Sequence, residues 1–364
     1  MTQRCPSSIR KFTSSRSNLR PRRTVTPERF STGLMRLTLP NRPSGYRVRL
    51  AMTDLPPGTV AMIAAEELDG ALVRSLTADF ERRGTVLRVE ATEFPTASST
   101  VKAVRWCLEL SNSDDTFGTQ LVSSLLDDAA EQLPVSAVTS TVLSAAQRPR
   151  GPLMLIMDVD STLIDQEVID LLAEFAGTAE DVSNVTERAM RGELDFTQSL
   201  HARVQTLAGL KDTVLHETYR ALTATAGAHE LIRSWLGRQW PVYAVSGGFQ
   251  QILKPLAADL DLTDFDANTL EITNGRLTGR TVGQVVDPQI KRQRLLEWGK
   301  RSGINVQNVV AVGDGANDAD MVRTAGVGIA FCAKPALIDH ADLVIRHRSL
   351  ELVAYALGLD ARHD

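Results

Sequence analysis

Two acidic segments of the chain have the spacing of a cation site, and the first contains Asp158 and Asp160. These two residues directly follow the apolar run at residues 153–157. If extended geometry continued past this run, both carboxylates would point the same way, and such a cluster is costly without a cation. An EF-hand does not fit, because its sixth position would be Leu163 instead of Gly and its twelfth Ile169 instead of Glu. A solvated Asp-Ser-Thr turn is the alternative for this segment alone.

The second acidic segment, Gly-Asp-Gly-Ala-Asn-Asp at residues 313–318, follows another apolar run at residues 309–312. Mg²⁺ prefers an octahedron of oxygens and keeps several waters, so a few carboxylates from two loops are enough to hold it. We therefore expect a Mg²⁺ site. The candidate ligands are Asp158, Asp160, Asp314 and, through water, Asp318.

Two further segments have the chemistry of an anion site. Ser246 and Gly247 stand between an apolar run at residues 242–245 and a helical segment, where glycine lets backbone N–H groups turn toward an anion. Lys291 follows Asp287 and Pro288, which have the pattern of an N-cap and a first helical residue. Alone, each segment is weak evidence for an anion site, because Ser-Gly-Gly is also an ordinary turn and most lysines are surface residues.

The three apolar runs predict the sheet that positions these groups. Runs at residues 153–157, 242–245 and 309–312 are typical of buried parallel strands, and helical segments separate them. This order predicts an α/β fold with a Rossmann-like parallel sheet, in which ligands bind beyond the carboxyl ends of the strands. Residues 166–226 are helical throughout and too long for a crossover, so we expect a helical cap over the site. Asn274-Gly275 predicts a hairpin between residues 270–273 and 276–278.

The amino-terminal part predicts a second unit, of the ferredoxin-like α+β type with order βαββαβ. Its expected elements are strands at 46–52, 85–93, 101–111 and 135–143 and helices at 60–83 and 118–133. The turn at residues 54–58, Asp-Leu-Pro-Pro-Gly, resembles the strand-to-helix turn of the ACT family of amino-acid-sensing domains, with one extra residue. A bare turn would look much the same, so a structural role or a homodimer through this unit is favoured over ligand sensing.

Composition limits the remaining classes. A length of 364 residues with 43% hydrophobic content predicts two globular units, at residues 45–146 and 151–364, with separate cores and a linker at 147–152. No apolar run approaches the roughly 18 residues of a membrane span, and a net charge of -4 does not favour nucleic acid. Residues 1–44 are expected to be a basic flexible tail, although a transit peptide has similar composition. Three cysteines give no disulfide framework or zinc spacing, which favours the cytoplasm.

Together these motifs resemble the haloacid dehalogenase superfamily, whose pattern is Asp-x-Asp, a Ser or Thr after the second strand, a Lys, and a Gly-Asp-x-x-x-Asp loop. Within that superfamily, residues 153–348 resemble the phosphoserine phosphatase family. The segments that carry the closer resemblance are residues 158–163, 189–196, 245–249 and 331–335.

The resemblance implies a role for each candidate residue. Asp158 would be the nucleophile and Asp160 the general acid and base, with Asp160 also binding the metal through its backbone carbonyl. In the core, Ser246, Gly247 and Lys291 would hold the phosphate, with Asn317 nearby. In the cap, Glu167 would meet the substrate ammonium and Arg203 its carboxylate, while Met190 and Phe196 would close over the site. His201 departs from the family, where we expect Arg.

The expected function is hydrolysis of phosphoserine, a small-molecule substrate, through an aspartyl phosphate, as the last step of serine biosynthesis. A phosphotransferase that delivers the phosphoryl group to another alcohol, such as homoserine, remains open. A catalytically silent amino-acid-sensing regulator is disfavoured because Asp158, Asp160, Lys291 and Asp314 are intact. A broad sugar-phosphate phosphatase fits less well, because Glu167 and Arg203 match a zwitterionic amino acid better.

Overall fold

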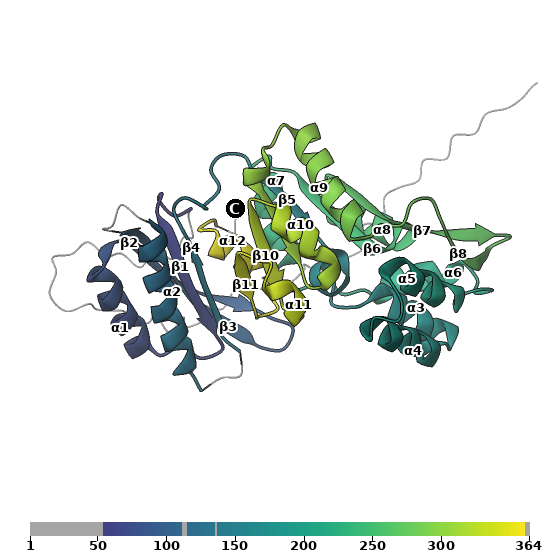
Figure 1. Cartoon of the computed structure of the whole chain (residues 1–364), viewed down its shortest axis with the longest axis horizontal. Coiled ribbons are helices and arrows are strands. Elements are labelled where there is room, and N and C mark those ends of the chain that lie inside the picture. The colour runs from purple at the N-terminus through teal and green to yellow at the C-terminus, as the bar shows by residue number, and fades with distance from the viewer. Residues whose placement is uncertain (1–53, 111–114, 135–136, 361–364) are drawn as a thin grey trace, which may run out of the picture. The chain divides into compact units, whose positions relative to one another are not determined.

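The computed structural model describes residues 54–110, 115–134 and 137–360 (Figure 1). The expected basic tail and the expected first strand at residues 46–52 lie outside these described residues. Within them, no helix is both long enough and apolar enough to cross a membrane.

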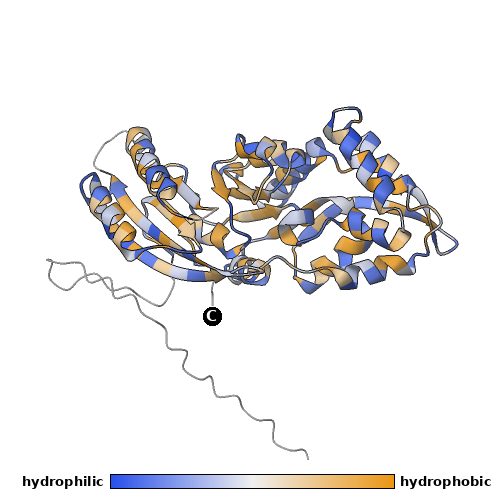
Figure 2. Ribbon diagram, turned by 90° about the horizontal axis from the view of Figure 1, so that it is seen from below, coloured by the Kyte–Doolittle hydropathy of each residue, from blue (hydrophilic) through white to orange (hydrophobic). Residues whose placement is uncertain are grey.

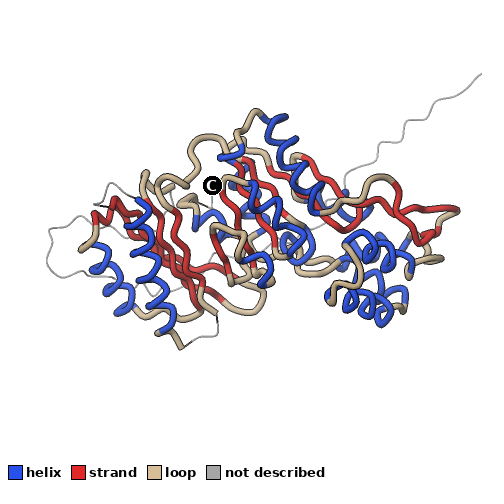
Figure 3. The backbone as a smooth tube through the Cα atoms, viewed as in Figure 1, coloured by secondary structure: helices blue, strands red, loops and turns tan. Residues whose placement is uncertain are grey.

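The amino-terminal unit is an antiparallel sheet with strand order β2-β3-β1-β4 and two helices, which is the predicted ferredoxin-like arrangement. Its elements are β1 (Thr59–Ala65), α1 (Gly70–Glu81), β2 (Gly84–Pro95), β3 (Thr100–Leu110), α2 (Asp115–Glu131) and β4 (Thr139–Leu143). β1 pairs with β3 on one side and with β4 on the other. Figure 3 shows the two helices beside this sheet.

The interpretation of residues 60–65 as the start of a helix is wrong, because they belong to β1. All seven residues of this strand are buried, so no apolar-polar alternation distinguishes it from a buried helix. The turn at residues 54–58 therefore precedes β1 and does not join a strand to a helix. That connection is residues 66–69, where the side chain of Asp69 caps α1 by accepting from Ala71 N. The likeness of the turn to the ACT family is lost with this correction.

The second sheet has seven strands in the order β11-β10-β9-β5-β6-β7-β8. Its strands are β5 (Met154–Met157), β6 (Val242–Phe249), β7 (Asp264–Thr273), β8 (Arg276–Val282), β9 (Val309–Gly313), β10 (Val327–Phe331) and β11 (Leu343–Ile345). All neighbours pair in parallel except β7 and β8, which form the predicted hairpin, and Asn274 and Gly275 both have positive φ. Since β5, β6 and β9 are adjacent, the three polar segments follow neighbouring strand ends.

Helices pack around this sheet, and hydrophobic residues concentrate on the strands between them (Figure 2). The helices outside the cap are α7 (Ala228–Gly237), α8 (Gln250–Asp259), α9 (Pro288–Ser302), α10 (Ala319–Thr324), α11 (Pro335–Ile338) and α12 (Glu351–Ala356). The short turns of helix are η1 (Val159–Leu163), η2 (Val306–Asn308) and η3 (Ala316–Asp318). The fold class is therefore the predicted α/β class.

The predicted cap is a group of four helices inserted between β5 and β6. They are α3 (Val168–Ala176), α4 (Ala179–Met190), α5 (Phe196–Gln205) and α6 (Thr213–Ala221). The chain enters and leaves the cap through two adjacent segments, where Ile164 and Ala224 form an antiparallel bridge. Asp195 begins α5 with a capping box, because its side chain accepts from Gln198 N and Gln198 in turn accepts from Asp195 N.

The two expected cores are not fully separate. α1 and α2 cover one face of the amino-terminal sheet and form a core with it. The opposite face, which includes Met62, Phe94 and Leu143, belongs to the same buried cluster as Leu352 and Tyr355 of α12. β1 is therefore buried on both sides, which explains why it is apolar almost throughout.

Candidate active site

The loop after β5 carries Asp158 and Asp160, and their carboxylates accept hydrogen bonds from different groups. The chain leaves the strand through η1, and Ser161 has a left-handed φ of 54°. Asp158 Oδ1 accepts from Val159 N at 2.8 Å. Asp160 Oδ1 accepts from Val168 N and Oδ2 from the Ser246 hydroxyl, both at 2.8 Å. Asp158 and Asp160 both have extended φ and ψ, but η1 begins at Val159 between them, so the strand geometry does not continue unbroken.

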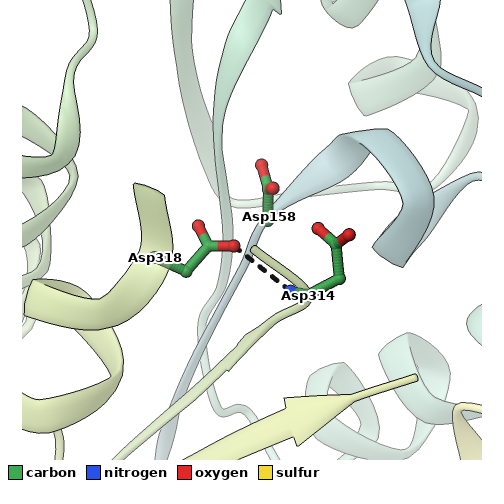
Figure 4. A group of neighbouring side chains, drawn as sticks. All are labelled: Asp158, Asp314 and Asp318. Atoms are coloured by element: carbon green, nitrogen blue, oxygen red, sulfur yellow. Dashed lines mark hydrogen bonds between the residues drawn. The ribbon is translucent and has the colours of Figure 1, made fainter. Parts of the chain in front are cut away.

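Three buried carboxylates form the cluster that could hold a metal ion: Asp158, Asp314 and Asp318 have ligand oxygens within 4.8 Å of one another (Figure 4). Asp318 fixes the loop, because its Oδ2 accepts from the N–H groups of Asp314 and Gly315, both at 3.2 Å. The side chain of Asp160 is outside this cluster. The donor set is all oxygen and negative, so a hard divalent cation fits it.

Lys291 is a buried cation that contacts two members of this cluster. Its Nζ lies 2.7 Å from Asp158 Oδ1 and 2.7 Å from Asp318 Oδ1, and its side chain is 0% exposed. Burial lowers the pKa of Lys291, but the two carboxylates outweigh burial and the net pKa is raised, so the ammonium stays charged. Asp287 caps α9 by accepting from Ile290 N at 2.8 Å, as predicted, and this places Lys291 in the first turns of the helix.

The carboxylates still carry more negative charge than Lys291 can balance. Burial, and then the charge of Asp318, raise the pKa of Asp158 well above its usual value, although Lys291 opposes them. Burial raises the pKa of Asp314 to about 6, against the opposing effect of Lys334. A cation at this point would favour the ionised forms of both acids. The raised pKa values and the all-oxygen donor set therefore both favour a bound cation at this cluster.

The end of β6 brings Ser246, Gly247 and Gly248 against the acidic loop. The Ser246 hydroxyl donates to Asp160 Oδ2 and accepts from Gly248 N at 2.7 Å. A Cβ on Gly248 would lie 2.9 Å from Asp160 Oδ2, and one on Gly247 would lie 3.1 Å from the ring of Phe196. A side chain at Gly248 would therefore crowd the Asp160 carboxylate, and one at Gly247 would crowd the Phe196 ring of the cap.

A cavity of about 320 Å³ lies where the cap faces the core. Its lining residues are Asp158, Asp160, Glu167, Ile169, Phe196, Leu200, Arg203, Gly247, Gly248, Phe249, Asp314, Gly315, Ala316, Asn317 and Lys334. It thus joins most of the predicted site residues of core and cap in one space. Ser246, Lys291 and Asp318 lie behind it, bonded to Asp160 or Asp158 or to one another. Met190 ends α4, but its side chain lies outside the described part of the chain.

Two cap residues give this cavity charges of opposite sign. Glu167 directly precedes α3, and its Oε1 accepts from the Ser161 hydroxyl at 2.9 Å. Arg203 lies on α5, where burial lowers its pKa while the nearby carboxylates, Glu167 first, oppose that effect. The exposed His201 is absent from the lining, so its departure from the family pattern does not alter the cavity.

The pKa of Asp160 is also raised, chiefly by burial and next by the charge of Glu167. The hydrogen bonds from Val168 N and Ser246 oppose this rise. A carboxyl group whose pKa is raised can hold a proton closer to neutral pH, as a general acid must.

Sequence reasoning missed Lys334 as a site residue. It lines the cavity, with Nζ 3.6 Å from Asp314 Oδ2 and 4.0 Å from Glu167 Oε1. Its backbone N–H donates to Asp314 O at 2.8 Å, which ties its loop to the acidic loop. The sequence did point to this segment, because residues 331–335 resemble the corresponding segment of the family. The sequence analysis assigned no chemical role to any of these residues.

Comparison with known proteins agrees with this fold. The family model described as haloacid dehalogenase-like hydrolase matches residues 155–323, which defines the class of protein. The chain is 50% identical to the phosphoserine phosphatase of Lactococcus lactis over 197 residues. These aligned residues make up 54% of this chain and 91% of that protein. Over 230 residues it is 44% identical to that of Streptomyces coelicolor, covering 63% of this chain and 56% of the relative. The chain belongs to the phosphoserine phosphatase family.

Solved structures extend the likeness. A probable phosphoserine phosphatase from Vibrio cholerae, in unliganded form, is similar with a TM-score of 0.65 and 29% identity, covering 86% of this chain and 90% of that one. A substrate-bound phosphoserine phosphatase complex is similar with a TM-score of 0.54 and 40% identity, covering 57% of this chain and 99% of that one. The first match is longer than the region after residue 150, so it includes part of the amino-terminal unit.

Proposed function

We propose that the protein hydrolyses O-phospho-L-serine to L-serine and phosphate through an aspartyl phosphate on Asp158. One observation carries this proposal: Glu167 and Arg203, of opposite charge, line the same cavity as Asp158 and Asp160. A substrate that fills this cavity can present a phosphoryl group to the core while its ammonium and carboxylate face the cap.

In the first step, a carboxylate oxygen of Asp158 attacks phosphorus and the bond to the serine oxygen breaks. Asp160 gives its proton to that oxygen, so serine leaves as an alcohol. In the second step, Asp160 takes a proton from water, the water oxygen attacks phosphorus, and the bond to Asp158 breaks. The raised pKa of Asp160 supports this exchange of roles.

Charge on the phosphoryl group has to be balanced, because positioning and electrostatics dominate phosphoryl transfer. Lys291, Ser246, Gly247 and Asn317 are the residues that we assign to the phosphoryl oxygens. Mg²⁺, held by Asp158, Asp314, the backbone carbonyl of Asp160 and, through water, Asp318, would neutralise part of that charge. Phosphate monoesters need up to about 10²¹-fold acceleration, so several such groups are required.

Recognition of the amino acid falls to the cap. Glu167 would bind the ammonium and Arg203 the carboxylate, while Phe196 and Met190 would cover the substrate. Closing the cap would exclude bulk water, and it must open for each turnover. We further propose that the enzyme acts in the cytoplasm, in the last step of serine biosynthesis, and that residues 45–146 serve structure or homodimer formation.

The test is a phosphate-release assay over phosphoserine, phosphothreonine, phosphoethanolamine and two sugar phosphates. Each is measured with Mg²⁺, with a chelator, and with Mg²⁺ restored. We expect phosphoserine to have the highest kcat/KM, and the chelator to abolish release until Mg²⁺ is returned. Adding homoserine separates hydrolysis from transfer, because transfer would form phosphohomoserine in place of inorganic phosphate. Equal rates for sugar phosphates and phosphoserine would contradict the proposed substrate.

A further inference from the structure

Arg348, just after β11, makes three hydrogen bonds to one short segment at the base of the cap. Its Nε donates to Asp165 Oδ1 at 2.6 Å, Nη1 to Ser161 O at 3.1 Å and Nη2 to Ile164 O at 3.0 Å. A guanidinium is a rigid planar fork, so three acceptors at once define the position of this segment closely. Lysine carries the same charge but could not hold all three acceptors in this geometry.

Two segments of the chain connect the core to the cap, and Arg348 binds the first of them. Asp165 N donates to Thr223 O, and Thr225 N donates to Leu163 O, each at 3.0 Å, so the two connecting segments are hydrogen-bonded to each other. The Thr225 hydroxyl also donates to Asp165 Oδ1 at 3.3 Å. We name residues 161–165 and 223–225 the cap hinge, because any movement of the cap must pass through them.

The cap hinge is also connected directly to the site. Ser161, whose carbonyl accepts from Arg348, follows Asp160 in the chain and donates through its hydroxyl to Glu167 Oε1 at 2.9 Å. Loss of the Arg348 fork would therefore loosen the backbone next to Asp160 and the contact that orients Glu167. The phosphate side of the site does not depend on these bonds, since Ser246 and Lys291 lie on other elements.

The segment that precedes Arg348 is bonded to the amino-terminal unit. The hydroxyl of Thr139, on β4, accepts from Arg346 N at 2.9 Å and lies 2.9 Å from Nδ1 of His347. Thr139 is fully buried, and the side chain of His347 is largely buried. One side chain of the amino-terminal sheet thus fixes the two residues directly before Arg348.

We propose that Arg348 is a positioning residue for the cap hinge and for Glu167, and that residues 346–348 transmit the position of β4 to this hinge. The amino-terminal unit would then influence substrate selection without contacting the substrate. The kinetic part of this inference rests on the proposed function, whereas the part about the hinge does not.

The kinetic test compares phosphoserine with p-nitrophenyl phosphate, which has neither ammonium nor carboxylate, in the full-length protein with Mg²⁺. We expect Arg348→Lys and Arg348→Ala to lower kcat/KM for phosphoserine by about tenfold to a hundredfold, because small misplacements of a binding group have such effects. The aryl ester should change by less than about threefold, because it makes no contact with Glu167 and its good leaving group needs little protonation by Asp160 in the step that kcat/KM reports. Arg346→Ala is the matched control, since that side chain is exposed and makes none of these contacts. Equal losses for both substrates would overturn the positioning role.

Hydrogen exchange tests the hinge without any substrate. In Arg348→Lys the amides of Asp165 and Thr225 should exchange about tenfold faster or more, because local opening is easier once the fork is lost. Thr139→Val should accelerate the same amides by a smaller factor, whereas Thr141→Val, on the same face of β4, should not. Identical exchange in Thr139→Val and Thr141→Val would overturn the link to β4. If the wild type fails to hydrolyse phosphoserine, the proposed function fails, while these exchange rates still decide the hinge.

Discussion

The guanidinium of Arg105, on β3, lies over the ring of Tyr355, on α12, at 4.1 Å from the ring centroid. The same group donates to Glu90 Oε2 through Nε and Nη2, at 2.8 and 2.6 Å, and to Leu359 O through Nη1 at 2.7 Å. The Tyr355 hydroxyl returns a hydrogen bond to Glu90 O at 2.9 Å. A buried ion pair of the amino-terminal sheet thus binds the carboxyl-terminal end of the chain.

Removing one partner of this pair should destabilise the whole protein. We expect Arg105→Met to lower the free energy of unfolding by about 2 to 4 kcal/mol, because Glu90 would keep only its longer contact with Arg88. The double variant Arg105→Met with Glu90→Leu should lose less, since no buried charge remains. Urea unfolding measures both, with Arg88→Met as control. A single variant no less stable than that control would mean that the pair contributes little.

Asp158→Asn should abolish turnover, because an amide nitrogen or oxygen does not replace the carboxylate as a nucleophile toward phosphorus. Intact-mass spectrometry after rapid acid quench should show a phosphorylated species in the wild type and none in the variant. Asp320→Asn, on α10 and outside the cavity, is the control and should keep both activity and intermediate. A phosphorylated Asp158→Asn protein would show that another residue is the nucleophile.

Arg203→Ala should separate substrate selection from chemistry. A guanidinium can bind a carboxylate by two charge-assisted hydrogen bonds of about 1.5 to 3 kcal/mol each, so kcat/KM for phosphoserine should fall about tenfold to several hundredfold. Phosphoethanolamine has no carboxylate to lose and should change much less. Glu167→Gln should weaken both substrates, because both carry an ammonium group. An equal loss of both substrates in Arg203→Ala would point to a role in the fold or in phosphate binding.

The pH dependence of kcat should shift in Glu167→Gln. The charge of Glu167 raises the pKa of Asp160, so its removal should lower that pKa. The first step needs protonated Asp160, so kcat falls as pH rises through this pKa, and the falling limb should move to lower pH in the variant. Glu174→Gln, an exposed change on α3, should leave the limb in place. A limb that moves to higher pH would exclude Asp160 as the acid described here.

The sequence alone determined the class of fold and much of the chemistry. The apolar runs at β5, β6 and β9, each followed by polar residues, predicted the sheet and the edge that carries the site, because such strands are buried on both faces. The Asn-Gly turn and the Asp-Pro helix start were also correct, since both depend on local backbone preferences. Glu167, Phe196 and Arg203 were assigned through the resemblance to the family, and the structure places all three in one cavity.

Only the tertiary structure decided features that depend on contacts between distant residues. β1 was misassigned because its second face is covered by α12, and periodicity cannot show a face that another unit buries. The groups that bond to the Asp160 carboxylate, Val168 N and the Ser246 hydroxyl, lie 8 and 86 residues away in the sequence. Lys334 lies within the matching segment at residues 331–335, but neither Lys334 nor Arg348 was assigned a role, because the role of a single cation depends on the groups that it contacts. The groups that these cations contact lie up to 187 residues away in the sequence, as Ser161 does from Arg348.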